Sequence, residues 1–177
     1  MTTQDIATAV QRAEAVLRRR PDMGMQDDSP ATARWQGGAR VTASHANGTA
    51  VSTDMPDELG GTGHLITPGW LFRAGLASCA TTSIAMTAAV EGLTLTTLEV
   101  VARSRSDTRG LLGMRDAQGA LIPAAPQAME LLVRIAAPGV STERLRAVVE
   151  LGCRHSPIPN AVQSALPLQL SIAVEAA

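Results

Sequence analysis

The chain has 177 residues, a formal net charge of −1 and 45% hydrophobic residues. This length and composition predict a single globular domain with its own core, and they exclude a disordered chain. The lack of a basic excess argues against a nucleic-acid partner. Because the chain contains two tryptophans, one phenylalanine and no tyrosine, its core must consist mainly of aliphatic side chains.

The N-terminal sequence and the number of cysteines indicate the cellular compartment of the protein. Residues 1–10 include Gln4 and Asp5 and lack the basic start and apolar run of a signal peptide. The chain has two cysteines, Cys79 and Cys153, too few for a disulfide scaffold. We therefore expect a cytoplasmic protein in which these cysteines are either inert core residues or redox-active ones.

The N-terminal third predicts a helix followed by a hairpin. Residues 4–19 have the apolar spacing of an amphipathic helix, which Pro21 ends. Residues 21–39 are predicted to form a loop. Two strand-like runs, 41–46 and 49–53, then flank Asn47-Gly48, a pair that predicts a hairpin with a type I′ turn. A glycine-rich loop follows over residues 56–66.

The next segment predicts a long uncharged helix. Thr67 suits the N-cap, Pro68 the first helical position and Gly92 the terminator. Residues 74–90 contain no charged side chain but include several serines and threonines. This length lies at the lower limit for a membrane span, so we predict a buried core helix of a soluble protein.

The second half predicts three strands and a helix. The strands show period-two alternation, and their apolar faces comprise Leu98, Val100 and Ala102; Met129, Leu131, Val133 and Ile135; and Leu168, Leu170, Ile172 and Val174. Between the last two strands, residues 142–153 predict a helix with Ser141 as its cap, which Ser156-Pro157 breaks or kinks. The order of elements predicts an α+β fold with long helices on an antiparallel-rich sheet.

Cys79 lies in the middle of the predicted central helix, among small residues. A buried cysteine in such surroundings is most often a small hydrophobic core residue. A mid-helix position gains little from the helix dipole, so a reactive thiolate there requires a nearby cation. From these residues alone, both interpretations of Cys79 stay open.

Several segments resemble the OsmC/Ohr family. The similar stretches are Pro56-Asp57-Glu58-Leu59-Gly60-Gly61 and Leu71-Phe72-Arg73-Ala74-Gly75-Leu76-Ala77-Ser78-Cys79. The later order also matches, with Gly92-Leu93, two strands, a helix ending near Ser156-Pro157-Ile158 and a last strand. The resemblance covers residues 31–175 and leaves residues 1–30 as an N-terminal helix and loop extension of the same domain.

The resemblance implies an intertwined OsmC-like homodimer with its sites at the subunit interface. It also implies an antioxidant thiol peroxidase of the oxidative stress response, without a cofactor. In the family, a thiolate that matches Cys79 attacks the O–O bond of an organic hydroperoxide and becomes a sulfenic acid. A second cysteine condenses with it to a disulfide, which an external dithiol reduces. An arginine lowers the pKa of the reacting thiol and stabilises the charge that develops during the attack, and a glutamate positions that arginine.

The sequence departs from this pattern at two positions. The family's Asn-Pro-Glu at the start of the cysteine helix is here Thr67-Pro68-Gly69, so the glutamate is missing. The second cysteine normally precedes a proline, a place that Ser156 occupies here; as a helix N-cap, Ser156 would have a purely structural role. Cys153 lies one helical turn earlier. It is either a displaced resolving cysteine or an inert helix residue.

Other candidate site residues follow from position. Arg40 and Arg34 are the upstream candidates for the arginine, whereas Arg73 lies off the face of Cys79; all three are otherwise solvated surface residues. Trp70 and Phe72 either line an apolar ligand pocket or fill the core. A Ser-His nucleophile at His155 lacks a third member, and a metal site lacks paired ligand spacing.

Two functions remain. The first is a thiol-dependent peroxidase that reduces organic hydroperoxides through Cys79, with atypical or absent resolving chemistry and an external thiol as reductant. The second is a catalytically silent protein of the same fold that binds a small apolar ligand at its dimer interface. Gly69 and Ser156 favour the second function, and Cys79 favours the first.

Overall fold

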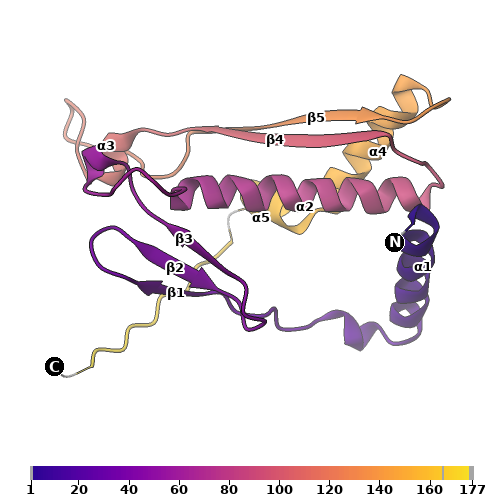
Figure 1. Cartoon of the computed structure of the whole chain (residues 1–177), viewed down its shortest axis with the longest axis horizontal. Coiled ribbons are helices and arrows are strands. Elements are labelled where there is room, and N and C mark those ends of the chain that lie inside the picture. The colour runs from indigo at the N-terminus through magenta and orange to yellow at the C-terminus, as the bar shows by residue number, and fades with distance from the viewer. Residues whose placement is uncertain (1, 165, 176–177) are drawn as a thin grey trace.

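The computed structural model describes residues 2–164 and 166–175, and the long helix α2 lies at its centre (Figure 1). The sheet of β4 and β5 covers one side of α2, and the sheet of β1, β2 and β3 lies on the other side. The described elements are α1 (Thr3–Arg19), η1 (Pro21–Gly24), β1 (Thr32–Trp35), β2 (Val41–Ser44), β3 (Ala50–Thr53), η2 (Asp57–Leu59), α2 (Pro68–Val90), β4 (Thr97–Arg105), α3 (Thr108–Leu111), β5 (Ala128–Ala136), α4 (Thr142–Arg154) and α5 (Pro157–Gln163). The predicted mixture of helices and antiparallel strands is confirmed.

The predicted N-terminal helix is confirmed as α1. Thr2 caps it, and the Thr2 and Asp5 side chains and backbones form a reciprocal capping box that fixes the first turn. Ala7 is its buried residue, and the helix packs against the C-terminal part of α2 (Figure 1).

The first sheet differs from its prediction in two respects. β1 lies within residues 21–39, which we expected to form a loop; it pairs antiparallel with β2, so that Trp35 faces Val41. The predicted hairpin is present as β2 and β3, but its turn is not type I′. That turn needs a positive φ at Asn47, whereas among the described residues only glycines, including Gly48 at 90°, have positive φ values.

The caps predicted for α2 are confirmed. The Thr67 side chain accepts a hydrogen bond from the Trp70 N–H, and Gly92 follows the helix with a φ of 72°. The expectation of a fully buried helix is wrong for the chain by itself. One stripe of α2 is exposed at four-residue intervals, formed by Ser78, Thr82, Met86 and Val90.

The core lies between α2, α4 and the sheet of β4 and β5. Ile84, Ala88 and Val148 form its buried cluster, and partly buried apolar residues from both strands pack around them. β4 and β5 pair antiparallel along their whole lengths, with Val100 opposite Val133. The apolar faces predicted for these two strands are therefore confirmed as core faces.

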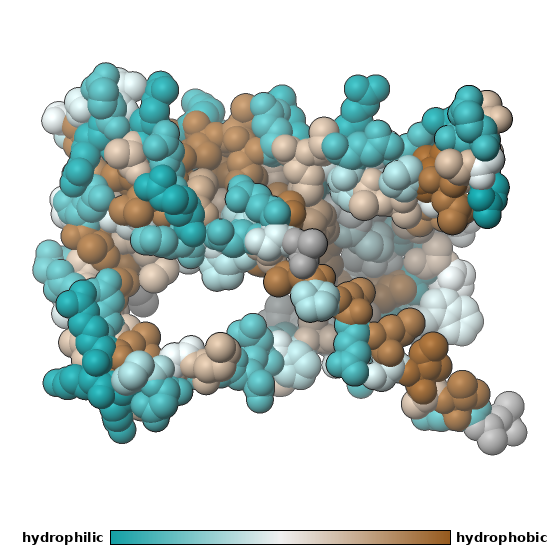
Figure 2. Space-filling view, turned by 180° about the vertical axis from the view of Figure 1, so that it is seen from behind, coloured by the Kyte–Doolittle hydropathy of each residue, from teal (hydrophilic) through white to brown (hydrophobic). Residues whose placement is uncertain are grey.

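The third predicted strand of this half does not form. Residues 166–175 belong to no strand, and their alternating apolar side chains are 77–96% exposed at Leu168, Leu170, Ile172 and Val174. Figure 2 shows this tail as a row of hydrophobic residues that extends away from the body of the molecule. The tail has the sequence of a strand but lies against no sheet edge of its own chain.

Among the described residues, no helix is both long enough and apolar enough to span a membrane.

Candidate functional site

Cys79 faces the helix pair α4–α5, and a close helix contact brings them together. A Cβ atom built on Gly152 would lie 2.7 Å from Ile84 Cα and 2.9 Å from Ile84 Cγ1. Only glycine therefore lets the backbone of α4 approach α2 this closely. This contact sets the position of the turn that follows α4.

The turn after α4 places Ser156 on Cys79. The Ser156 hydroxyl donates a hydrogen bond to Cys79 Sγ at 3.2 Å. Ser156 is fully buried and Cys79 is half-buried. Although Ser156 occupies the N-cap position of α5, its side chain makes no capping hydrogen bond. The Ser156 hydroxyl therefore does not cap the helix, as its purely structural role would require, but points to the sulfur of Cys79.

Cys153 has different surroundings. Both cysteines are free thiols, and Cys153 packs against the core cluster of Ile84, Ala88 and Val148. Burial raises the pKa of the Cys153 thiol, which opposes formation of a thiolate at that position. These surroundings favour the interpretation of Cys153 as a packed helix residue.

The two upstream arginines predicted as partners of Cys79 are found on the β1–β3 sheet and beside Asp54. Arg34 is exposed on β1. Arg40 lines a cavity of about 120 Å³ together with Asp54 and Thr62. Among the described residues, no arginine is hydrogen-bonded to Cys79, whose hydrogen-bond partner is Ser156.

Arg73 lies beside the missing glutamate position. Its guanidinium donates to the Ser104 hydroxyl of β4 at 3.2 Å. A Cβ atom on Gly69 would lie 3.7 Å from Arg73 Nη1. A side chain at position 69 would thus meet Arg73, whereas Gly69 leaves this guanidinium bonded to Ser104.

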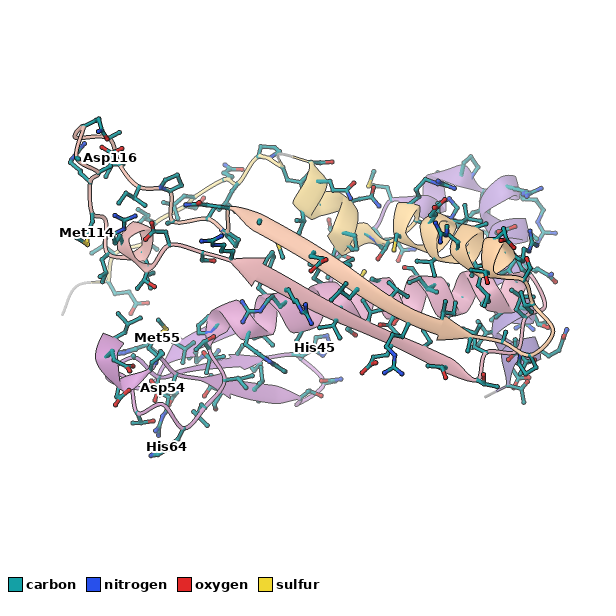
Figure 3. The ribbon with its side chains drawn as sticks, turned by 90° about the horizontal axis from the view of Figure 1, so that it is seen from above. His45, Asp54, Met55, His64, Met114 and Asp116 are labelled. Atoms are coloured by element: carbon teal, nitrogen blue, oxygen red, sulfur yellow. The ribbon has the colours of Figure 1, made fainter. Side chains whose placement is uncertain are left out.

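A buried carboxylate, Asp54, organises the loop before α2. It accepts hydrogen bonds from the Thr62 hydroxyl at 2.7 Å, the Thr62 N–H at 3.0 Å and the Met55 N–H at 2.8 Å. Figure 3 shows Asp54 and Met55 together at the end of β3, with His64 on the loop nearby. The Thr62 hydroxyl and amide, then the Met55 amide and the charge of Arg40, hold the Asp54 pKa below its usual value against the opposing effect of burial.

Trp70 and Phe72 do not fill the core of this chain. They are 48% and 44% exposed, and Phe72 lines a cavity between α2 and the β1–β3 sheet, together with Leu71 and Val41. His45 and His64 lie apart (Figure 3). In the part of the chain that the structure describes, no group of three histidine, cysteine, aspartate or glutamate side chains is placed to hold a metal ion.

Three contributors to the site were not identified from the sequence. Gly152 permits the close contact between α4 and α2, and Asp54 holds the loop that precedes α2. Asn160 is hydrogen-bonded to the turn that carries Ser156. A single glycine, aspartate or asparagine produces no periodic pattern. Asn160 had one usable signal, because an asparagine soon after a helix end is a common partner for the last carbonyl groups.

The pair of Cys79 and Ser156 supports one kind of chemistry. A thiolate is a nucleophile, and a hydroxyl that donates to it stabilises negative charge on the sulfur. The same hydroxyl cannot form a disulfide. The site therefore combines a candidate nucleophile with a hydrogen-bond donor, and no disulfide joins Cys79 to Cys153.

The comparisons agree with this architecture. A search of curated protein sequences found no match. Among solved structures, the chain is similar to an OsmC-like protein from Mycoplasma pneumoniae, with a TM-score of 0.64, 18% identity and coverage of 78% of this chain and 89% of that one. For an organic hydroperoxide resistance protein from Elizabethkingia anophelis, the TM-score is 0.56, the identity 20% and the coverage 78% and 91%.

A third similar structure is a putative organic hydroperoxide resistance protein from Vibrio cholerae, with captopril bound in one of its active sites. Its TM-score is 0.53 and its identity 23%, with coverage of 78% of this chain and 88% of that one. The three TM-scores show a shared fold, at sequence identities of 18–23%. The family described as OsmC-like protein matches residues 61–171, a stretch that contains both Cys79 and Ser156 and most of the chain. The chain therefore belongs to the OsmC-like protein family.

Proposed function

We propose that this protein is a thiol peroxidase that reduces organic hydroperoxides with Cys79 as its only reacting cysteine. The observation that carries this proposal is the hydrogen bond from Ser156 to Cys79 Sγ at 3.2 Å. It is supported by family membership and by similar structures that are named organic hydroperoxide resistance proteins.

In the proposed reaction, the Cys79 thiolate attacks the terminal oxygen of a hydroperoxide. The O–O bond breaks, Cys79 becomes a sulfenic acid, and the alkoxide leaves and takes a proton to become an alcohol. An external thiol then condenses with the sulfenic acid, which releases water and leaves a mixed disulfide. A second external thiol restores the Cys79 thiol and leaves as the external disulfide.

Ser156 has a defined role in this scheme. Its hydroxyl donates a hydrogen bond to the sulfur before the attack. Because serine has no thiol, it cannot condense with the sulfenic acid of Cys79 afterwards. Since Cys153 packs in the core with a raised thiol pKa, we assign it no part in the reaction. The reducing thiol must therefore come from outside the chain.

A mostly apolar cavity, which Glu14 and Glu91 also line, opens one helical turn along α2 from Cys79. It has a volume of about 320 Å³ and runs between α1, α2 and α4, with Val10, Met86, Val90 and Leu151 in its lining. Ser83, one turn after Cys79, and His155, next to Ser156, also line it. We assign the apolar group of the hydroperoxide to this cavity, because two of its lining residues adjoin the pair along the chain.

The protein is proposed to act as a homodimer. The described chain has an accessible surface of 13129 Å², whereas a folded monomer of 18.4 kDa exposes about 8,200 Å². The excess includes the exposed stripe of α2 and the apolar tail of residues 166–175. A second copy of the chain is the partner that would cover both.

One observation favours the alternative, a silent protein that binds a small apolar ligand. Within the described residues no arginine is hydrogen-bonded to Cys79, and Gly69 stands where the resemblance places the family's glutamate. This alternative predicts binding to the apolar cavity without any chemical change at Cys79.

Steady-state turnover separates the two functions. The purified protein is mixed with cumene hydroperoxide and a small dithiol, and consumption of the hydroperoxide is followed against a Cys79→Ser control. We expect turnover that requires Cys79 and that Cys153→Ala leaves nearly unchanged. Equal rates for the wild type and Cys79→Ser would exclude the peroxidase and leave the binding protein.

A further inference from the structure

The turn between α4 and α5 directs the Ser156 hydroxyl toward Cys79. An N-cap serine usually accepts a hydrogen bond from the N–H of the second or third helical residue. In α5 the third helical residue is Pro159, which has no N–H, so only the N–H of Ile158, the second residue, is available for capping. The Ser156 side chain makes no capping bond and donates to Cys79 Sγ.

Asn160 fixes the backbone of this turn. Its side-chain Nδ2 donates to the carbonyl oxygens of Ser156 at 2.7 Å and Arg154 at 2.8 Å, with a longer contact of 3.4 Å to Cys153. Its backbone N–H also donates to the Ser156 carbonyl, at 3.1 Å, and the Ser156 N–H donates to the Cys153 carbonyl, at 3.2 Å. Both backbone polar groups of Ser156 are thus bonded within the turn.

These bonds require the amide of asparagine. The last carbonyl groups of a helix have no partner inside the helix, and the Asn160 amide supplies donors to them at the end of α4. A carboxylate of the same size accepts hydrogen bonds but donates none when ionised. Aspartate at this position would therefore keep the shape of the side chain and lose its bonds to the turn.

We propose that Asn160 is a positioning residue that holds position 156 against the sulfur of Cys79. The inference rests on the proposed function, since it treats Cys79 and Ser156 as the reactive pair. It goes further by assigning the alignment of that pair to an exposed side chain that touches neither the sulfur nor the Ser156 hydroxyl.

The test measures this alignment without using a peroxide. In Ser156→Cys, the introduced thiol and Cys79 are equilibrated with reduced and oxidised glutathione. Closing the intramolecular disulfide reduces one oxidised glutathione to two thiols, so the equilibrium constant reports how well the two sulfurs are held together. Asn160→Asp and Asn160→Ala are made in this background. Gln163→Ala, at an exposed residue of α5, is the matched control.

We expect both Asn160 variants to lower the equilibrium constant by about tenfold, because each loses the hydrogen bonds that fix the turn. Gln163→Ala should leave it unchanged. Circular dichroism checks folding, and the isosteric Asn160→Asp keeps the test valid if Asn160→Ala unfolds. A constant for Asn160→Asp equal to that of Ser156→Cys alone overturns the inference, as does failure of the disulfide to form in Ser156→Cys itself.

The outcome is separate from that of the proposed function. If the Asn160 variants lower the disulfide equilibrium constant but no hydroperoxide oxidises Cys79, the peroxidase is excluded and the role of Asn160 is retained. An unchanged constant in an active peroxidase would do the reverse.

Discussion

Ser156 stands where the sequence resemblance places the second cysteine of the family, and its hydroxyl lies 3.2 Å from Cys79 Sγ. One oxygen in place of one sulfur keeps a polar contact with the nucleophile and removes the internal route to a disulfide. Under the proposed function, this single side chain separates a two-cysteine from a one-cysteine mechanism.

Restoring the sulfur should restore that route. In Ser156→Cys, we expect one equivalent of an organic hydroperoxide to produce a disulfide between Cys79 and the introduced thiol, because the two side chains already touch and a disulfide needs only a small further approach. Peptide mass spectrometry identifies the bond. The variant should also resist over-oxidation by excess peroxide. A disulfide of Cys79 with Cys153 in the unmodified protein would show that the displaced cysteine resolves after all.

Asp54 predicts a specific dependence of stability on pH. Its pKa is lowered in the folded protein, so its contribution is present above the unfolded value of about 3.9 and is lost as the pH falls through that value toward the lower folded one. Thr62→Val removes the hydroxyl that donates at 2.7 Å. The variant should lose stability at pH 7 and lose less than the wild type on acidification.

Urea unfolding at pH 7 and below pH 4 measures this effect. Thr62→Ser, which keeps the hydroxyl, is the matched control and should follow the wild type. If Thr62→Val were destabilised equally at both pH values, the bond to the Asp54 carboxylate would not be the cause.

Residues were predicted from the sequence only where they belonged to a recognisable pattern. Cys79 and Ser156 stand in segments that resemble a family. Asp54 and Asn160 act through local hydrogen bonds that depend on how the loop after β3 and the turn after α4 fold, and an isolated polar residue does not reveal such a partner.

At the scale of elements, the contact between α4 and α2 determines where the site forms. Gly152 lies against Ile84, and Ser156 follows four residues later on the turn that reaches Cys79. The distance between the two helices thus controls the distance between positions 79 and 156.

Gly152→Ala tests this link. The added methyl group would lie 2.7 Å from Ile84 Cα, so we expect a loss of about 1–3 kcal/mol in the free energy of unfolding and a weaker Ser156–Cys79 contact. Glu150→Ala, on the exposed face of α4, should stay within about 0.5 kcal/mol of the wild type. Urea unfolding compares the two. A Gly152→Ala protein as stable as the wild type would show that the helices adjust without cost.

The elements with a clear period were the ones that the sequence predicted. α1, α4, β4 and β5 follow apolar spacing, and α2 is marked by its uncharged run over residues 74–90 and by its caps. β1 has only four residues, all of them exposed, so it carries no alternation of apolar and polar positions. The tail of residues 166–175 alternates clearly but pairs with no strand of its own chain, and an alternating pattern alone does not say which sheet edge a strand joins.

At the scale of the whole molecule, the exposed apolar surfaces are the reason to expect a dimer. The exposed stripe of α2, which includes Met86 and Val90, and the exposed apolar side chains of the tail cost free energy in water. We expect a stable homodimer that buries more than about 2,000 Å² in total, as obligate dimers do. Sedimentation equilibrium at micromolar concentration measures the mass, and a monomer would contradict the expectation.

The alternation of the tail predicts which substitutions disturb the dimer. Leu170→Arg and Ile172→Arg place a charge on the apolar face and should raise the dissociation constant. Ser171→Arg, between them on the opposite face, should leave it nearly unchanged, because a strand presents alternate residues to alternate sides. Equal effects from all three variants would show that the tail does not pair as a strand.

The central claim is that Cys79 reacts with hydroperoxides without a resolving cysteine, and the mass of the intact protein after one equivalent of an organic hydroperoxide tests it most directly. We expect the addition of one oxygen atom, trapped by a sulfenic acid reagent on Cys79, absent in Cys79→Ser and retained in Cys153→Ala. Excess peroxide should add further oxygen atoms to the same residue. A Cys79 that stays unmodified at every peroxide dose would contradict the account.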